Sequence, residues 1–201
     1  MSNNKNKSPI KTIALAMFFV AIFLLYFNYI NNQKGNMKVE RTRSEVDKLC
    51  EYDMVGDYPK TPRDVVKLHC RFFKAFYIGD ADDKALENYE IDDEKLAILN
   101  HQIRSLYSSE LLGINLEKDS LINLKNSIEN MKKEGYSYKN YVLPEHSQVT
   151  YYKQNGVEMA SLDVEVVLGT NEKRGYIYER YVLVKEGEQW KILGWGEDSK
   201  Q

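Results

Sequence analysis

The feature that most constrains this chain is an uncharged, apolar run near its N-terminus. Residues 13–27 read IALAMFFVAIFLLYF, and the uncharged window around them covers residues 12–33. As a helix, this window would span roughly 33 Å at about 1.5 Å per residue, enough for a hydrocarbon layer of about 30 Å. Tyr26 and Tyr29 stand where an interfacial aromatic belt is expected. We therefore predict a transmembrane anchor over residues 12–33, with the lipid bilayer as its partner.

A cleavable signal peptide is the alternative, because an apolar run of this length also suits a long signal-peptide core. The run leaves through residues 27–31, FNYIN, which contain no small-x-small cleavage pattern, and the first cysteine is Cys50. A buried soluble helix would normally show a polar face, which this run lacks. These observations favour an uncleaved anchor.

Basic residues stand on both sides of the anchor, so the positive-inside rule does not decide its orientation. Three lysines precede the anchor and four basic residues follow it: Lys5, Lys7, Lys11, Lys34, Lys38, Arg41 and Arg43. We expect residues 1–11 to be a cytoplasmic tail, because a short tail before a first anchor is the usual layout. The protein is then a single-pass protein of the cell membrane, with its C-terminal domain extracytoplasmic.

The residues after the anchor are numerous enough for one domain with a core of its own. Residues 1–37 hold four lysines and no acidic residue, so the remainder carries 24 basic against 30 acidic side chains. This excess of negative charge argues against nucleic acid as a partner, because nucleic-acid-binding domains present a basic face. We assign residues 34–57 to a tether and residues 58–201 to the domain.

Helical patterns come first in this domain. Thr61 is a good N-cap, Pro62 suits the first helical position, and Asp64 follows where a capping acid belongs. The apolar stripe that follows predicts a buried helix ending near Gly79. Further helices are predicted at residues 84–89, from Asp92 or Asp93 to about residue 113, and over residues 117–134; a helical stalk is predicted over residues 37–50.

The pattern then changes to the alternation of β-strands. Strands are predicted at residues 136–143, 148–153, 157–168, 176–185 and 189–195, and Asn155-Gly156 is a strong hairpin signal. Five tyrosines around the first hairpin suggest an adhesive surface, although strand propensity explains them equally well: Tyr136, Tyr138, Tyr141, Tyr151 and Tyr152. Helices followed by an antiparallel meander indicate an α+β domain with its helices on one face of a sheet.

The tail YERYVLVKEGEQWKILGW resembles the closing hairpin of the NTF2-like superfamily, whose fold is a cystatin-like α+β cone. Together with SEVDKLCEYDMVGDYPKTPRDVVKLHCRFFKAFY, it is similar to an uncharacterised bacterial family of single-pass, membrane-anchored NTF2-like proteins. The resemblance covers residues 44–196. It implies N-terminal helices packed on a curved antiparallel sheet and is compatible with a homodimer through the sheet. It brings no known activity and no functional residues.

NTF2-like cones also house enzymes, so polar residues within the strands are candidates for a ligand-binding pocket. These candidates are Asp163, Glu165, Tyr178, Glu179 and Arg180. A carboxylate inside an apolar cone would have a raised pKa and could move protons. In the alternative interpretation, Asp163 and Glu165 face solvent on one strand face and pair with Arg180 across the sheet.

No pattern points to a metal, a cofactor or a catalytic residue. His69, His101 and His146 fall in different predicted elements without ligand spacing, and His69 suits a hydrogen-bonded core position. Cys50 and Cys70 could pair in an extracytoplasmic domain or remain separate thiols.

We therefore expect a non-enzymatic, membrane-tethered interaction or ligand-sensing module with a protein partner in the envelope, such as an accessory of a secretion or conjugation machine. The alternative is a small-molecule-binding protein or enzyme that uses the cone as a pocket. A cone filled by Phe72, Phe76 and tryptophan side chains would argue against that alternative.

Overall fold

The computed structural model describes residues 44–77, 91–170 and 173–197. The predicted tail at residues 1–11, the anchor at residues 12–33, the start of the tether and the short helix at residues 84–89 lie outside the described residues. Within the described ranges, no helix has the length and apolar character needed to cross a bilayer.

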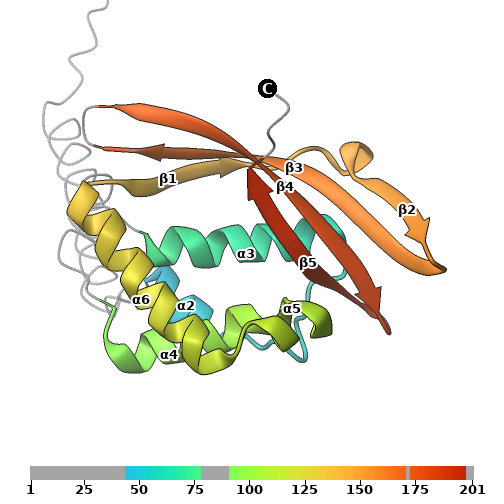
Figure 1. Cartoon of the computed structure of the whole chain (residues 1–201), viewed down its shortest axis with the longest axis horizontal. Coiled ribbons are helices and arrows are strands. Elements are labelled where there is room, and N and C mark those ends of the chain that lie inside the picture. The colour runs from blue at the N-terminus through green and yellow to red at the C-terminus, as the bar shows by residue number, and fades with distance from the viewer. Residues whose placement is uncertain (1–43, 78–90, 171–172, 198–201) are drawn as a thin grey trace, which may run out of the picture. The chain divides into compact units, whose positions relative to one another are not determined.

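Helices precede strands, as the sequence predicts. The helices are α2 (Glu45–Cys50), α3 (Pro62–Phe76), α4 (Asp93–Arg104), α5 (Ser109–Ile114) and α6 (Glu117–Glu134). The strands are β1 (Ser137–Val142), β2 (Thr150–Gln154), β3 (Val157–Gly169), β4 (Arg174–Glu186) and β5 (Gln189–Glu197), with a short 3-10 helix at His146–Gln148. The described helices lie on one side of the antiparallel sheet (Figure 1). The predicted α+β class, with helices packed against an antiparallel sheet, is confirmed.

Helix α3 begins where its capping residues predict. The Thr61 hydroxyl oxygen accepts a hydrogen bond from the Asp64 backbone N–H at 3.1 Å, and Pro62 occupies the first turn, where its missing N–H costs nothing. The helix packs against β1, β3 and β5 and buries Val65 and Phe72 completely. It is thus the central helix of the interior.

The predicted helix from residue 92 to residue 113 is instead two helices, α4 and α5. Between them, the Ile192 N–H donates to the Leu106 carbonyl at 2.7 Å, and the Ser108 N–H donates to the Ile192 carbonyl at 2.8 Å. The Ser108 hydroxyl then caps α5 by accepting from the Leu111 N–H at 3.2 Å. Backbone pairing with β5 thus replaces the helical hydrogen bonds that would have joined the two segments.

Strand β3 is the centre of the sheet, whose order is β1-β3-β4-β5. Strands β1 and β2 pair with opposite ends of β3 along the edge that β4 leaves open. Asn155 and Gly156 join β2 to β3 with φ values of 52° and 82°, as the Asn-Gly signal predicts. The long β3–β4 pair extends from Met159 to Gly169 on β3.

Alternation along the sheet separates an inner face from an outer face. The inner face includes Leu162 and Val164 of β3 and Leu183 of β4, all buried against the helices. Phe72 and Phe76 of α3 are 0% and 4% exposed, and Phe73 packs edge-on against Trp195 of β5, so aromatic side chains fill much of the interior around α3.

The segment before α3 is attached to both layers of the domain. Residues 45–50 of the predicted tether form α2, which packs against α3 and α4 with Val46 and Leu49 fully buried. The Tyr58 hydroxyl donates to the Trp190 carbonyl of β5 at 2.8 Å, and the Lys191 ammonium lies 4.3 Å from the centre of the Tyr58 ring.

Candidate functional site

Four of the five residues predicted for a pocket lie on the outer face of the sheet. Asp163 stands opposite Arg180, and Glu165 stands opposite Tyr178. The Arg180 guanidinium donates to both carboxylate oxygens of Asp163, at 2.7 and 2.9 Å, and this bond lowers the pKa of Asp163. The Tyr178 hydroxyl donates to Glu165 at 3.0 Å. These side chains pair with one another across the sheet. This is the arrangement expected if they face solvent rather than the inside of a pocket.

Glu179 is the predicted residue that faces inward, because it alternates with Tyr178 and Arg180 along β4. Its carboxylate accepts a hydrogen bond from the Tyr181 hydroxyl at 3.2 Å. The same hydroxyl lies 3.2 Å from Nδ1 of His69, and Nε2 of His69 lies 3.3 Å from the Tyr107 hydroxyl. We call Glu179, Tyr181, His69 and Tyr107 the Glu179 chain. It joins β4, α3 and the connection between α4 and α5.

The interior members of the Glu179 chain are buried, which fixes their charge. Burial lowers the pKa of His69 to about 3, so the imidazole is neutral at ordinary pH. Burial raises the pKa of Tyr107, Tyr181 and Glu179, and the hydrogen bond from Tyr181 opposes the rise at Glu179. The chain is therefore a series of neutral groups ending at one partly exposed carboxyl group.

Aromatic rings surround His69. The centres of the Phe73 and Trp195 rings each lie 4.6 Å from the centre of the imidazole, and Trp195 also stacks on Tyr107 and Tyr181. The sequence predicts His69 as a hydrogen-bonded core residue, and the structure shows it as one. Its partners were not predicted, since Tyr107 and Tyr181 stand 38 and 112 residues further along the chain.

The two cysteines do not pair. Cys50 is partly buried near the Lys95 carbonyl, whereas Cys70 is buried with its sulfur 3.9 Å from the Tyr181 hydroxyl. Burial raises the pKa of Cys70 to about 12, so it remains a thiol. Within residues 44–77, 91–170 and 173–197, no group of three or more His, Cys, Asp or Glu side chains is placed to hold a metal ion.

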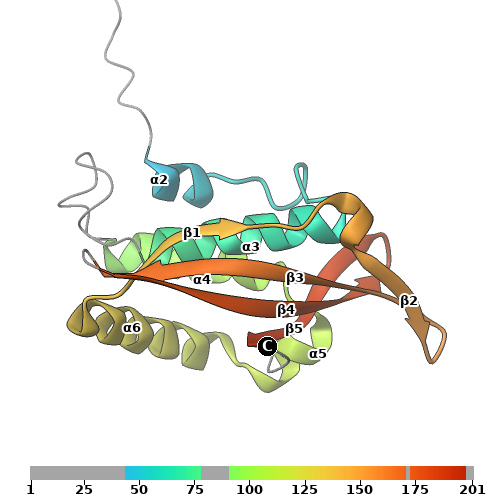
Figure 2. The same ribbon diagram turned by 90° about the horizontal axis from the view of Figure 1, so that it is seen from above.

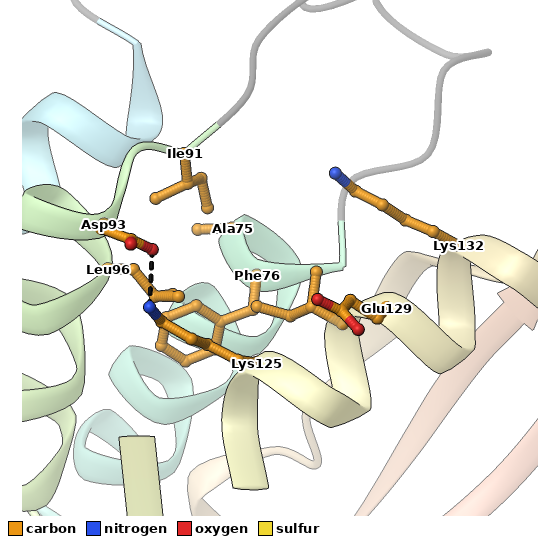
Figure 3. A pocket seen from close by; sticks show the side chains of 9 residues that line it. Ala75, Phe76, Ile91, Asp93, Leu96, Lys125, Glu129 and Lys132 are labelled. Atoms are coloured by element: carbon orange, nitrogen blue, oxygen red, sulfur yellow. Dashed lines mark ion pairs between the residues drawn. The ribbon is translucent and has the colours of Figure 1, made fainter. Parts of the chain in front are cut away.

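A small cleft lies between α3, α4 and α6, away from the Glu179 chain. Its floor includes Phe76, Leu96 and Ile128, and Lys125 and Asp93 form an ion pair of 2.6 Å on its rim (Figure 3). Its volume of about 180 Å³ is below the roughly 300–1,000 Å³ of typical small-molecule sites. The cleft has room for a group the size of one side chain.

The hairpin of residues 150–161, which we call the β2–β3 arm, exposes all of β2 and the first two residues of β3. It extends beyond the helices, as Figures 1 and 2 show. Every residue of β2 is exposed, and Tyr151, Tyr152 and Val157 are 56%, 36% and 42% exposed. In the described part of the chain, β2 pairs only with β3, so its other edge carries unpaired backbone groups.

The five tyrosines predicted near the first hairpin do not form one surface. Tyr138 and Tyr141 of β1 pair with residues 166–168 of β3, whereas Tyr151 and Tyr152 pair with residues 159 and 160. Tyr138 is also buried. The exposed tyrosines of the arm are therefore Tyr151 and Tyr152, which lie on opposite faces of β2, and Tyr151 packs edge-on against Trp190.

Three comparisons relate the chain to known proteins. A family model described as a domain of unknown function, DUF6715, matches residues 1–195. No curated protein matches the chain. Among solved structures, the chain is similar to the NMR solution structure of TraH, a proposed transfer protein of the Gram-positive conjugative plasmid pIP501. The identity is 12% and the TM-score 0.37, over 71% of this chain and 99% of TraH.

Proposed function

The chain belongs to the DUF6715 family, and from its sequence and geometry we propose that it is a non-enzymatic, membrane-tethered module that binds an extended segment of another envelope protein. The observation that carries this proposal is the β2–β3 arm, which presents an unpaired strand edge and two exposed tyrosines. An exposed strand edge binds an extended peptide through main-chain hydrogen bonds, and alternate side chains supply specificity. Tyrosine is enriched at such interfaces.

The tether and the location belong to the same proposal. The uncharged residues 12–33 support a single-pass anchor, and the short preceding tail supports an extracytoplasmic domain. We expect protease added to intact cells, or to spheroplasts where an outer membrane is present, to degrade the domain while a cytoplasmic marker survives. Survival of the domain until the cells are lysed would place it inside the cell and overturn this part of the proposal.

The arm is tested by photocrosslinking in living cells. We expect a photoreactive phenylalanine analogue in place of Tyr152 to crosslink the full chain to a partner protein. Tyr176 is the matched control, since it is 62% exposed on the same outer face. Tyr176 pairs with Val167 of β3, and Tyr152 pairs with Met159 of the same strand. These two partners are eight residues apart, so the two sites are separated by about 26 Å at about 3.3 Å per residue.

Equal crosslinking from both positions, or none from position 152, would contradict the proposal. A product of twice the mass of the chain would identify a second copy, the homodimer that the NTF2-like resemblance allows, and would also overturn it. The identity of a captured partner would show whether the module belongs to a secretion or conjugation machine.

We further propose that the helices and the sheet form an NTF2-like cone. The pocket alternative needs an open interior with at least one predicted polar residue inside it. Glu179 faces that interior, but the rings of His69, Tyr181 and Trp195 pack against one another there. The arm therefore supports a protein partner better than the interior supports a small molecule.

A further inference from the structure

The Glu179 chain has one consistent arrangement of protons while Glu179 is ionised. A carboxylate can only accept hydrogen bonds, so the Tyr181 hydroxyl proton is used toward Glu179. The Tyr181 oxygen must then accept from His69, which places the imidazole proton on Nδ1. Because a neutral imidazole carries a single proton, Nε2 accepts from the Tyr107 hydroxyl.

A neutral carboxyl group at position 179 allows each of these bonds to reverse. A protonated Glu179 can donate to the Tyr181 oxygen, which frees the Tyr181 proton for Nδ1 of His69. The imidazole proton then resides on Nε2 and is donated to the Tyr107 oxygen. The number of hydrogen bonds is unchanged, so an ionised Glu179 requires the first arrangement, whereas a neutral Glu179 makes the second available.

We infer that the Glu179 chain is a hydrogen-bond relay, in which the charge on Glu179 sets the tautomer of His69 and the direction of the hydrogen bond at Tyr107. This inference does not depend on the proposed partner. Tyr107 precedes Ser108, whose N–H is bonded to the Ile192 carbonyl of β5. The relay therefore leads from the partly exposed Glu179 of β4 to the point where the α4–α5 connection is joined to the sheet.

The surroundings of Glu179 leave its charge uncompensated. Tyr181 is its hydrogen-bond donor on β4, the Cys70 thiol of α3 and the Tyr138 hydroxyl of β1 face the same region, and Glu197 stands opposite on β5. The ion pairs of the described ranges do not include Glu179, so a proton is the group best placed to neutralise it.

The test is the tautomer of His69, read by nitrogen NMR of the full chain in detergent micelles with ¹⁵N-labelled histidine. His101→Gln and His146→Gln variants identify the His69 signals. We expect Nδ1 to carry the proton in the unsubstituted chain at neutral pH and Nε2 to carry it in Glu179→Met, which removes the acceptor at similar volume. Asp163→Asn is the control, since Asp163 lies on the outer face of the neighbouring strand, and it should leave the tautomer unchanged.

Acidifying the unsubstituted chain is a second measurement that needs no substitution inside the fold. As the pH falls, we expect the proton to move from Nδ1 to Nε2 before the imidazole becomes doubly protonated. A proton on Nε2 at neutral pH, or a direct passage from the Nδ1 form to the doubly protonated form, would overturn the relay. So would a folded Glu179→Met variant that keeps the proton on Nδ1.

Discussion

Phe72→Ala is expected to lower the free energy of unfolding by about 3–5 kcal/mol, the range for removing a buried phenylalanine ring. Phe72 is completely buried in the C-terminal half of α3, and its ring centre lies 6.3 Å from that of Phe76. The substitution leaves a cavity in the core beside α3, and the surrounding side chains can close it only in part. Urea unfolding of the full chain in detergent micelles, followed by the fluorescence of Trp190 and Trp195, measures the loss.

Val142→Ala is the control for this measurement. Val142 is 53% exposed at the end of β1, so its truncation should change the free energy of unfolding by no more than about 0.5 kcal/mol. A loss below about 1 kcal/mol for Phe72→Ala would mean that the interior is not densely filled. That result would restore the alternative in which the space between helices and sheet is a pocket.

The second large effect is a loss of stability in acid that originates at His69. Its pKa is about 3 in the folded protein and about 6.5 when the chain is unfolded. Between these values the unfolded chain binds a proton that the folded chain does not, so stability falls as the pH falls from about 6.5 toward 3. The slope approaches about 1.4 kcal/mol per pH unit, and we expect His69→Gln to remove this component.

Glu179 acts in the opposite sense over part of this range. Its pKa is raised in the folded protein, so the folded chain binds this proton first, and stability rises as the pH falls through the raised value toward 4.5. The slope due to His69 is therefore clearest below pH 4.5. His101, exposed on α4 beside Glu117, is the matched control. The measurement is urea unfolding at a series of pH values between about 3 and 4.5. If the free energy of unfolding depends on pH equally in His69→Gln and His101→Gln, His69 is not the source of the loss of stability in acid.

The parts of the fold that the sequence predicts are those set by local rules. The Thr61 cap, the Asn155-Gly156 turn and the limits of α6, which ends before Gly135 in the left-handed conformation, depend on residues close together in the chain. The break between α4 and α5 was not predictable in this way. It depends on backbone bonds to Ile192, a residue far along the sequence.

The candidate site shows the same division. Strict alternation along β4 already separates Glu179 from Tyr178 and Arg180, so the face of each residue follows from the sequence once the strand is assigned. The partners of Glu179 do not follow, because His69 and Tyr107 meet Tyr181 only after α3 and the α4–α5 connection have packed against the sheet. No local pattern encodes a contact between residues so far apart.

The position of α2 has a mechanical consequence. Glu45 of this helix is bonded to Arg71 of α3 at 2.7 Å, and Asp47 is bonded to Lys95 of α4 at 2.8 Å. A pulling force that enters along the backbone from the N-terminal side is therefore borne first by α3 and α4. The β2–β3 arm and α2 lie at opposite ends of the domain (Figure 2). A force that enters through α2 therefore does not act first on the arm, where the partner is proposed to bind.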